Sequence, residues 1–201
     1  MQQNEPQQAV ETIATETEKP RKKGFWAEAL SWLKELAIAF VIIGLVCIFL
    51  IQPVRVEGTS MCDTLQNGEI MLVTKPEYLF GDPAFGDVVI CRYPGRGLEI
   101  FVKRVMGLPG DVIEIRDNVV YRNGEAVSEP YLTPDRNDNG FDMAPFSLGE
   151  QEYFVMGDHR DRSHDSRNYY PDGTPSAITR DMIHGHVRWV AFPFNQIRTV
   201  E

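Results

Sequence analysis

A serine and a lysine in this chain have the types and settings needed for covalent chemistry: Ser60 in "EGTSMCDTL" and Lys103 in "EIFVKRVMG". A serine hydroxyl is a weak nucleophile until a neighbouring base takes its proton. The period of two of a β-strand places Phe101, Lys103 and Val105 on one face. Burial of that face would lower the lysine pKa and make the neutral amine available as a base. The alternative is an exposed lysine that guards an edge strand. Together the two residues suggest a Ser-Lys dyad.

Histidines and cysteines offer competing chemistries. The four histidines lie in "GDHRDRSHDSR" and "IHGHV": His159, His164, His184 and His186. Loops rich in Arg and Asp favour solvated, charge-paired histidines over a Ser-His arrangement. The H-x-H pair lacks nearby carboxylate or Cys partners, and the three cysteines form no C-x-x-C pair, so we expect no metal and no cofactor. Cys62 as nucleophile and a Cys62–Cys91 disulfide stay open as alternatives, with unbridged thiols favoured.

An apolar run, "LAIAFVIIGLVCIFLI", occupies residues 36–51 without a charge. It is shorter than the ~20 residues that cross a bilayer, but the amphipathic turns before it and a snorkelling Lys34 supply the missing rise. A buried soluble helix and a cleaved signal peptide both fit this stretch less well. We therefore expect residues 25–52 to form a single transmembrane anchor.

The segments on either side of the anchor differ in composition. Residues 1–24 are polar and rich in Gln, Glu and Thr, which predicts a disordered tail. The basic residues of this tail lie at 19–23, so the positive-inside rule places it in the cytoplasm and residues 53–201 outside the plasma membrane. The net charge of the chain is −9, and the outer part is also acidic, which argues against nucleic-acid binding.

Strand patterns dominate residues 53–201 and predict a mainly β, antiparallel domain. Alternating apolar runs recur between Gly, Pro and Asp residues, and Asn123-Gly124 is a strong hairpin signal. One soluble helix is plausible, at 176–183. Residues 129–145, "EPYLTPDRNDNGFDMAP", are typical of a surface loop that could close over a groove.

Four motifs resemble the successive sequence boxes of the type I signal peptidases: "GTSMCDTL", "FGDVVICRYP", "FVKRVMGLPGD" and "GDHRDRSHDSR". The preceding anchor belongs to the same pattern, in the short form with one anchor that is typical of Gram-positive bacteria. The resemblance implies a membrane-bound serine endopeptidase with a partly barrel-like β fold. Such an enzyme removes signal peptides with small-x-small ends from exported preproteins, and its partners are the lipid bilayer and the secretion translocon.

The resemblance also implies roles for individual residues. Ser60 matches the nucleophile, Lys103 the general base, and Ser163 the serine that hydrogen-bonds and orients the lysine amine. Charged positions that hold the site together match Asp158, Arg104, Asp165 and Arg167. Small apolar substrate pockets match Val56, Met61, Leu65, Phe101 and Val102. Core packing is the other interpretation for each pocket residue.

The chain departs from the family pattern at three positions. Some members carry a hydroxyl residue two positions before the nucleophile, where this chain has Gly58, so the oxyanion contact expected is the backbone N–H of Ser60 with a backbone or water donor in second place. Asp63 stands where proline is usual, which leaves the turn looser or replaces proline with a side-chain to backbone hydrogen bond. His159 stands where asparagine is usual.

Three other functions compete with a general signal peptidase. The altered turn could belong to a dedicated peptidase for a narrow set of precursors such as pilins. A non-catalytic homologue that binds signal peptides is disfavoured because Ser60, Lys103 and Ser163 are present. A self-cleaving regulatory protease with Ser-Lys chemistry is disfavoured by the anchor and by the lack of a DNA-binding module.

Overall fold

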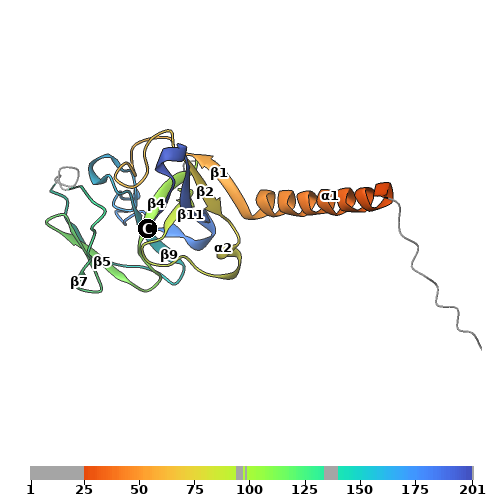
Figure 1. Cartoon of the computed structure of the whole chain (residues 1–201). Coiled ribbons are helices and arrows are strands. Elements are labelled where there is room, and N and C mark those ends of the chain that lie inside the picture. The colour runs from red at the N-terminus through yellow and green to blue at the C-terminus, as the bar shows by residue number, and fades with distance from the viewer. Residues whose placement is uncertain (1–24, 94–96, 98, 134–139, 201) are drawn as a thin grey trace, which may run out of the picture. The chain divides into compact units, whose positions relative to one another are not determined.

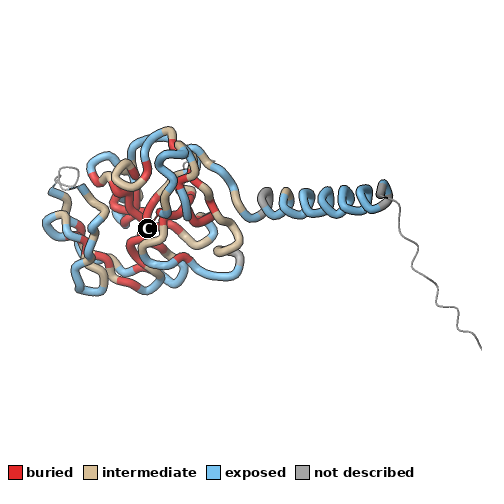
Figure 2. Tube along the Cα trace, viewed as in Figure 1, coloured by how far each residue is buried: buried red, intermediate tan, exposed pale blue. Residues whose placement is uncertain are grey.

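The computed structural model describes residues 25–93, 97, 99–133 and 140–200. Helix α1 (Phe25–Leu50) contains a window, Glu28–Val46, that is long and apolar enough to cross a membrane, and this window has no buried residues. Figure 2 shows the exposure along α1. Apolar side chains such as Trp26 and Phe40 are exposed, which suits a lipid surrounding better than water. The predicted tail and its basic cluster lie outside the described residues.

The main sheet follows α1 directly (Figure 1). Its neighbours pair in the order β1-β2-β11-β3-β4-β9-β10, with β12 on β11, and every pair is antiparallel. The strands are β1 (Ile51–Arg55), β2 (Ile70–Thr74), β3 (Val88–Cys91), β4 (Phe101–Gly107), β9 (Glu152–Met156), β10 (Ile178–Thr179), β11 (Ile183–Phe192) and β12 (Arg198–Thr199). Register shifts within β11 and β4 increase the local twist, and the sheet curls into a half-barrel.

A smaller sheet has the order β7-β6-β5-β8. Its strands are β5 (Val112–Arg116), β6 (Val119–Arg122), β7 (Glu125–Ala126) and β8 (Met143–Ser147). The predicted hairpin is confirmed, because Asn123 and Gly124 link β6 to β7 with φ of 52° and 83°. Strand β8 begins at Met143, inside the stretch expected to be a loop, and residues 134–139 of that stretch lie outside the described residues.

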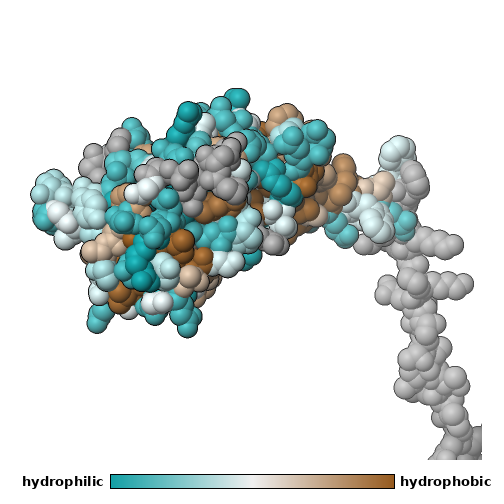
Figure 3. Space-filling model, turned by 90° about the vertical axis from the view of Figure 1, so that its left-hand side faces the viewer, coloured by the Kyte–Doolittle hydropathy of each residue, from teal (hydrophilic) through white to brown (hydrophobic). Residues whose placement is uncertain are grey.

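Apolar side chains of the β domain, the part of the chain after α1, form three core clusters. The first cluster packs β1, β2 and β11 against the turn that follows β1. The second packs the smaller sheet against residues of β4 and β9, and the third joins β3, β4 and β9. The red segments in Figure 2 mark these buried stretches, while the face of the β domain in Figure 3 is largely hydrophilic. Strand β4 lies between β3 and β9, so its residues are held from both edges.

The helix predicted at 176–183 is wrong. Ile178 and Thr179 instead pair with β9 as strand β10, a 3₁₀ turn (Arg180–Met182) follows, and β11 begins at Ile183. β-Branched Ile178 is fully buried in the pairing, which outweighs a weak helical pattern. Among the described residues of the β domain, the α-helix is α2 (Glu77–Phe80), which follows Pro76.

Candidate active site

The turn that carries Ser60 joins β1 to β2. The backbone N–H groups of Thr64 and Leu65 donate to the Met61 carbonyl, at 2.8 and 2.6 Å, which makes one compact helical turn. Met61 and Leu65 insert into the core cluster of β1, β2 and β11 and so anchor the turn. Gly58 enters it with φ of +100°, a conformation that side chains disfavour.

Lys103 lies at the centre of β4, opposite Val89 of β3, and its side chain is only 1% exposed. Its Nζ is 2.8 Å from Ser60 Oγ. The expectation of a buried lysine is therefore confirmed, and the exposed edge-strand alternative is wrong. The sheet supplies the lysine and the anchored turn supplies the serine, so the two meet although they are far apart in sequence.

Burial lowers the pKa of Lys103, because the charged ammonium loses its hydration. The Asp165 carboxylate acts in the opposite direction, and the Arg167 guanidinium lowers the pKa further. Complete burial raises the pKa of the neighbouring Cys91 thiol to about 12, so this group stays neutral at physiological pH and adds no negative charge. The surroundings thus favour the neutral amine.

A buried ion pair holds the segment after β9 against β4. Arg104 donates through Nε and Nη2 to the two carboxylate oxygens of Asp158, at 3.0 and 2.9 Å. Arg104 also donates to the Gly86 carbonyl at 2.9 Å, and the Thr64 hydroxyl donates to Asp158. Because Thr64 belongs to the Ser60 turn, this pair links β4, the turn and the loop after β9.

A second buried pair, Arg167 with Asp165, shapes the same loop. Arg167 donates through Nε and Nη2 to Asp165 at 2.8 and 2.9 Å, and the Gly157 N–H donates to Asp165 at 3.0 Å. Although complete burial raises the pKa of Asp165, hydrogen bonds and charge from Arg167 hold it below its usual range. The carboxylate is ionised and paired.

Gly157 lies where the chain has no space for a side chain. A Cβ added there would be 2.2 Å from Ser163 Oγ and 2.5 Å from the Ser60 carbonyl oxygen. Ser163 is therefore next to the Ser60 turn, as predicted. Among the described residues its Oγ makes no hydrogen bond to the Lys103 amine, so the predicted bond is absent, and the Ser163 hydroxyl instead lies close enough to Asp165 to help lower the pKa of that carboxyl. Packing in β4 and the contact with Ser60 orient the lysine instead.

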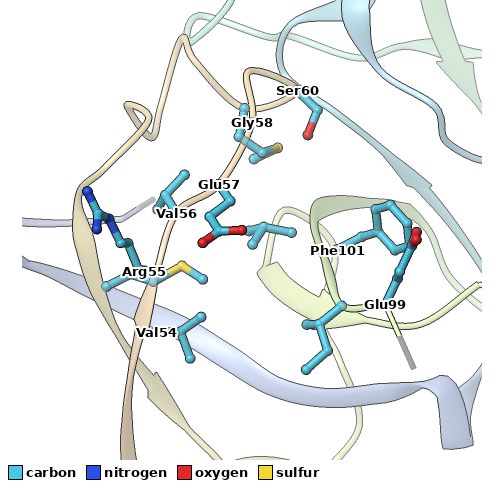
Figure 4. Close-up of a pocket in the computed structure, with 12 residues that line it drawn as sticks. Val54, Arg55, Val56, Glu57, Gly58, Ser60, Glu99 and Phe101 are labelled. Atoms are coloured by element: carbon cyan, nitrogen blue, oxygen red, sulfur yellow. The ribbon is translucent and has the colours of Figure 1, made fainter. Parts of the chain in front are cut away.

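A groove of about 530 Å³ opens beside Ser60. Figure 4 shows residues of β1 and the segment after it on one side, and Glu99 and Phe101 on the other. Of the predicted pocket residues, four border the groove: Val56, Met61, Phe101 and Val102. Leu65 is fully buried in the core, because it anchors the turn from below. Sequence reasoning missed Val54, Arg55, Glu57, Met71, Glu99 and Ile100, which also line the groove.

The candidate oxyanion donors differ in their availability. The Gly58 N–H donates to the Asn67 side chain at 3.1 Å, so it is already engaged. The Ser60 N–H donates to no acceptor among the residues that the structure describes. The geometry therefore favours Ser60 over Gly58 as an oxyanion contact.

The two unusual residues of the turn and loop each make a specific contact. Asp63 Oδ2 accepts a hydrogen bond from the Thr133 N–H at 2.9 Å, so a side-chain to backbone bond does occur at this position. Cys62 Sγ lies 2.9 Å from His159 Nδ1, and the His159 N–H donates to the Ser60 carbonyl at 3.0 Å. Cys62 and Cys91 do not form a disulfide.

The sequence predicted no carboxylate close to the H-x-H pair, and this prediction is wrong for His186. Its side chain is buried, its Nδ1 lies 2.7 Å from Glu77 Oε2, and its Nε2 lies 3.6 Å from Asp87 Oδ1. These carboxylates come from distant parts of the chain, which local sequence does not reveal. Across the described ranges, no three His, Cys, Asp or Glu side chains are grouped to hold a metal ion.

Three residues near the site were not singled out from the sequence. Glu129 forms an ion pair with Arg160, whose side chain is 1% exposed, and the Tyr131 ring lies under Arg104 with its centroid 3.9 Å from Cζ. Arg160 in "GDHRDR" and Glu129 in "EPY" can both be recognised in the sequence as charged residues. Their pairing depends on a contact between segments about thirty residues apart.

We expect Asp158→Ala to lower the free energy of unfolding by about 3–5 kcal/mol, because the Arg104 guanidinium would stay buried without a counter-charge. Denaturant unfolding of the full chain in detergent, followed by fluorescence, measures the change. The control is Asp82→Ala, which breaks the exposed pair with Arg180 and should leave stability unchanged. Equal losses in the two variants would contradict the structural importance of the buried pair.

Comparison with known proteins agrees with the geometry. Residues 29–192 match the family described as "Signal peptidase, peptidase S26". Signal peptidase I of Bacillus licheniformis is 39% identical over 93% of this chain and 100% of its own length, and signal peptidase I T of Bacillus subtilis (strain 168) is 38% identical over 92% and 95%. A solved signal peptidase I from Enterococcus faecalis V583 is 28% identical, with a TM-score of 0.43 over 53% of this chain and 97% of that one. The chain belongs to the type I signal peptidases of peptidase family S26.

Proposed function

We propose that the protein is an active, membrane-anchored signal peptidase in which Ser60 is the nucleophile and Lys103 the general base. The observation that carries the proposal is the 2.8 Å contact between Lys103 Nζ and Ser60 Oγ, buried on the lysine side and open to a groove on the serine side. Membership of the family and the apolar helix α1 support the same function.

The reaction begins with the neutral amine of Lys103. It takes the Ser60 proton as Oγ attacks the scissile carbonyl, and it then gives that proton to the leaving amine. The same amine activates the water that hydrolyses the acyl-enzyme. The Ser60 N–H is the proposed donor to the oxyanion, and a water is the proposed second donor because the Gly58 N–H is engaged.

The substrates we propose are exported preproteins whose signal peptides end in small residues. An extended segment fits the groove, where Val56, Met61 and Val102 offer apolar contacts of limited depth. Basic residues before the helix support a cytoplasmic N-terminus and a β domain outside the plasma membrane. Contact with the secretion translocon belongs to the same proposal.

The mechanism predicts that Ser60→Ala and Lys103→Ala each reduce cleavage of an Ala-x-Ala preprotein by on the order of 10⁴-fold or more. Cys62→Ser should retain most of the activity, because the thiol is no part of the proton transfer. Cleavage by the full chain in detergent, followed by gel or mass spectrometry, measures both. Activity that survives Ser60→Ala but disappears in Cys62→Ser would make Cys62 the nucleophile.

A panel of preproteins in the same assay separates a general peptidase from a dedicated one, and no cleavage of any precursor would favour a binding homologue.

Burial of the base predicts the pH dependence. Since burial lowers the pKa of Lys103, the acylation rate should rise with pH and level off below the ~10.4 of free lysine. Single-turnover cleavage at several pH values gives this profile. His159→Asn, which removes a nearby imidazole ring, should keep the same rising limb. A limb that appears only near ~10.4 would show that the base is not the buried amine.

The buried amine also predicts a conflict between activity and stability. Because its pKa is lower in the folded protein than in the unfolded chain, the unfolded chain binds more protons between the two values, and stability rises with pH across that interval. Lys103→Met, of similar length, should abolish cleavage, raise the Tm at neutral pH and remove this pH dependence. Thermal unfolding of both proteins in detergent tests it. A lower Tm for the variant would argue against a desolvation cost at Lys103.

A further inference from the structure

Residues 129–133, which we call the strap, connect three separate parts of the proposed site. The strap lies between β7 and β8 of the smaller sheet in sequence and is described up to Thr133. Its first contact is the ion pair between Glu129 and Arg160, in which Arg160 Nη1 donates to Glu129 Oε2 at 3.0 Å. The two side chains are 8% and 1% exposed. A pair buried this deeply depends on both partners, since either one alone would leave an uncompensated charge.

The arginine of this ion pair also contacts Gly157. Arg160 Nε donates to the Gly157 carbonyl at 3.1 Å. Gly157 packs against Ser163 and the Ser60 carbonyl so closely that a Cβ would not fit. A shift of Arg160 would therefore move a residue that contacts the carbonyl of the nucleophile. Glu129 acts on Ser60 through two intermediate residues.

The middle of the strap covers Arg104. The Tyr131 ring lies 3.9 Å from Arg104 Cζ, a distance at which a cation–π interaction is favourable. The Tyr131 hydroxyl donates to Glu129 at 2.7 Å, so the two strap residues are joined to each other. Arg104 holds Asp158, and Asp158 accepts from Thr64 of the Ser60 turn.

The end of the strap contacts the Ser60 turn itself. The Thr133 N–H donates to Asp63 Oδ2 at 2.9 Å, across 70 residues of sequence. Asp63 lies three residues after the nucleophile, within the turn that the Met61 carbonyl closes by accepting from the Thr64 and Leu65 N–H groups. An aspartate in this turn leaves the backbone more conformational freedom than a residue with a fixed φ, and a bond to a second segment restricts that freedom.

We propose that Asp63 and Glu129 are positioning residues, which use the strap to hold Ser60 Oγ at the distance from Lys103 that proton transfer needs. The inference rests on the proposed roles of Ser60 and Lys103. Misplacement of a reacting group by ~1 Å can cost up to about 10²-fold in rate. A strap fixed at Glu129, Tyr131 and Thr133 limits such displacement of the turn and of Gly157 together.

The first test uses two substitutions at Asp63 in the full chain in detergent, with an Ala-x-Ala preprotein as substrate. Asp63→Leu keeps the branched shape but accepts no hydrogen bond, and we expect kcat to fall about tenfold with little change in KM, since orientation is lost and groove binding is not. Asp63→Asn can still accept from the Thr133 N–H, so it should retain kcat. The Tm should be similar in both variants.

A matched control comes from Asp142, an exposed aspartate that accepts a hydrogen bond from the Asp117 N–H at 2.7 Å in the smaller sheet. Asp142→Leu removes the same kind of bond away from the site and should leave kcat unchanged. Glu129→Gln should lower kcat. The double variant Asp63→Leu/Glu129→Gln should lower kcat by less than the product of the two single effects, because both residues act through one strap. The double variant Asp63→Leu/Asp142→Leu should have the kcat of Asp63→Leu alone, because the two effects are independent.

Several results would overturn the proposal. Wild-type kcat in Asp63→Leu would show that the Thr133 bond does not position Ser60. Equal losses in Asp63→Asn and Asp63→Leu would assign the effect to charge, and independent effects of Asp63 and Glu129 would exclude a shared strap. Full cleavage by Ser60→Ala would instead refute the proposed function, so the two failures can be told apart.

Discussion

The structure depends on one constraint, which is that an amine must be buried against a serine hydroxyl while remaining neutral. Lys103 is 1% exposed and 2.8 Å from Ser60 Oγ. Burial alone lowers its pKa, but an unpaired carboxylate nearby would reverse the effect. Both nearby aspartates are therefore matched by arginines, in the pairs Asp165 with Arg167 and Asp158 with Arg104. Asp165 and Asp158 still raise the pKa of Lys103 and Arg167 lowers it, and the effect of burial outweighs that of the two carboxylates.

This arrangement explains why so many buried polar groups surround a small site. A buried ion pair is weak evidence for stability, because desolvation offsets much of the attraction. Its geometric demands are strict, however, and bidentate arginine–carboxylate contacts fix the relative orientation of two segments. Here the segments are β4, the Ser60 turn and the loop after β9. The net contribution of an intact pair to the free energy of unfolding is small although removal of one partner is costly, and the geometry of the pairs fixes the relative positions of Ser60 and Lys103.

Local sequence was sufficient for features that depend on neighbouring residues. The Asn123-Gly124 pair predicted the hairpin, because its effect arises within a few residues, whereas the period of two around Lys103 left both a buried and an exposed lysine open. Features that depend on distant pairing were missed. Within the segment at 176–183, Ile178 pairs with Tyr153 to form β10, and His186 contacts Glu77, which is more than a hundred residues away in the sequence. The bond from Ser163 to Lys103 was expected from the family resemblance alone, and no such bond is found among the described residues.

The departure at Asp63 follows from the same distinction. A proline would stiffen the Ser60 turn from within, by fixing φ of one residue, and its effect would be local. The aspartate acts through a contact with Thr133, so the stiffness of the turn depends on a segment that is itself held by Glu129 and Tyr131. A local constraint has been replaced by a tertiary one. Under the proposed role of the strap, changes between β7 and β8 reach the nucleophile without touching either the groove or the lysine.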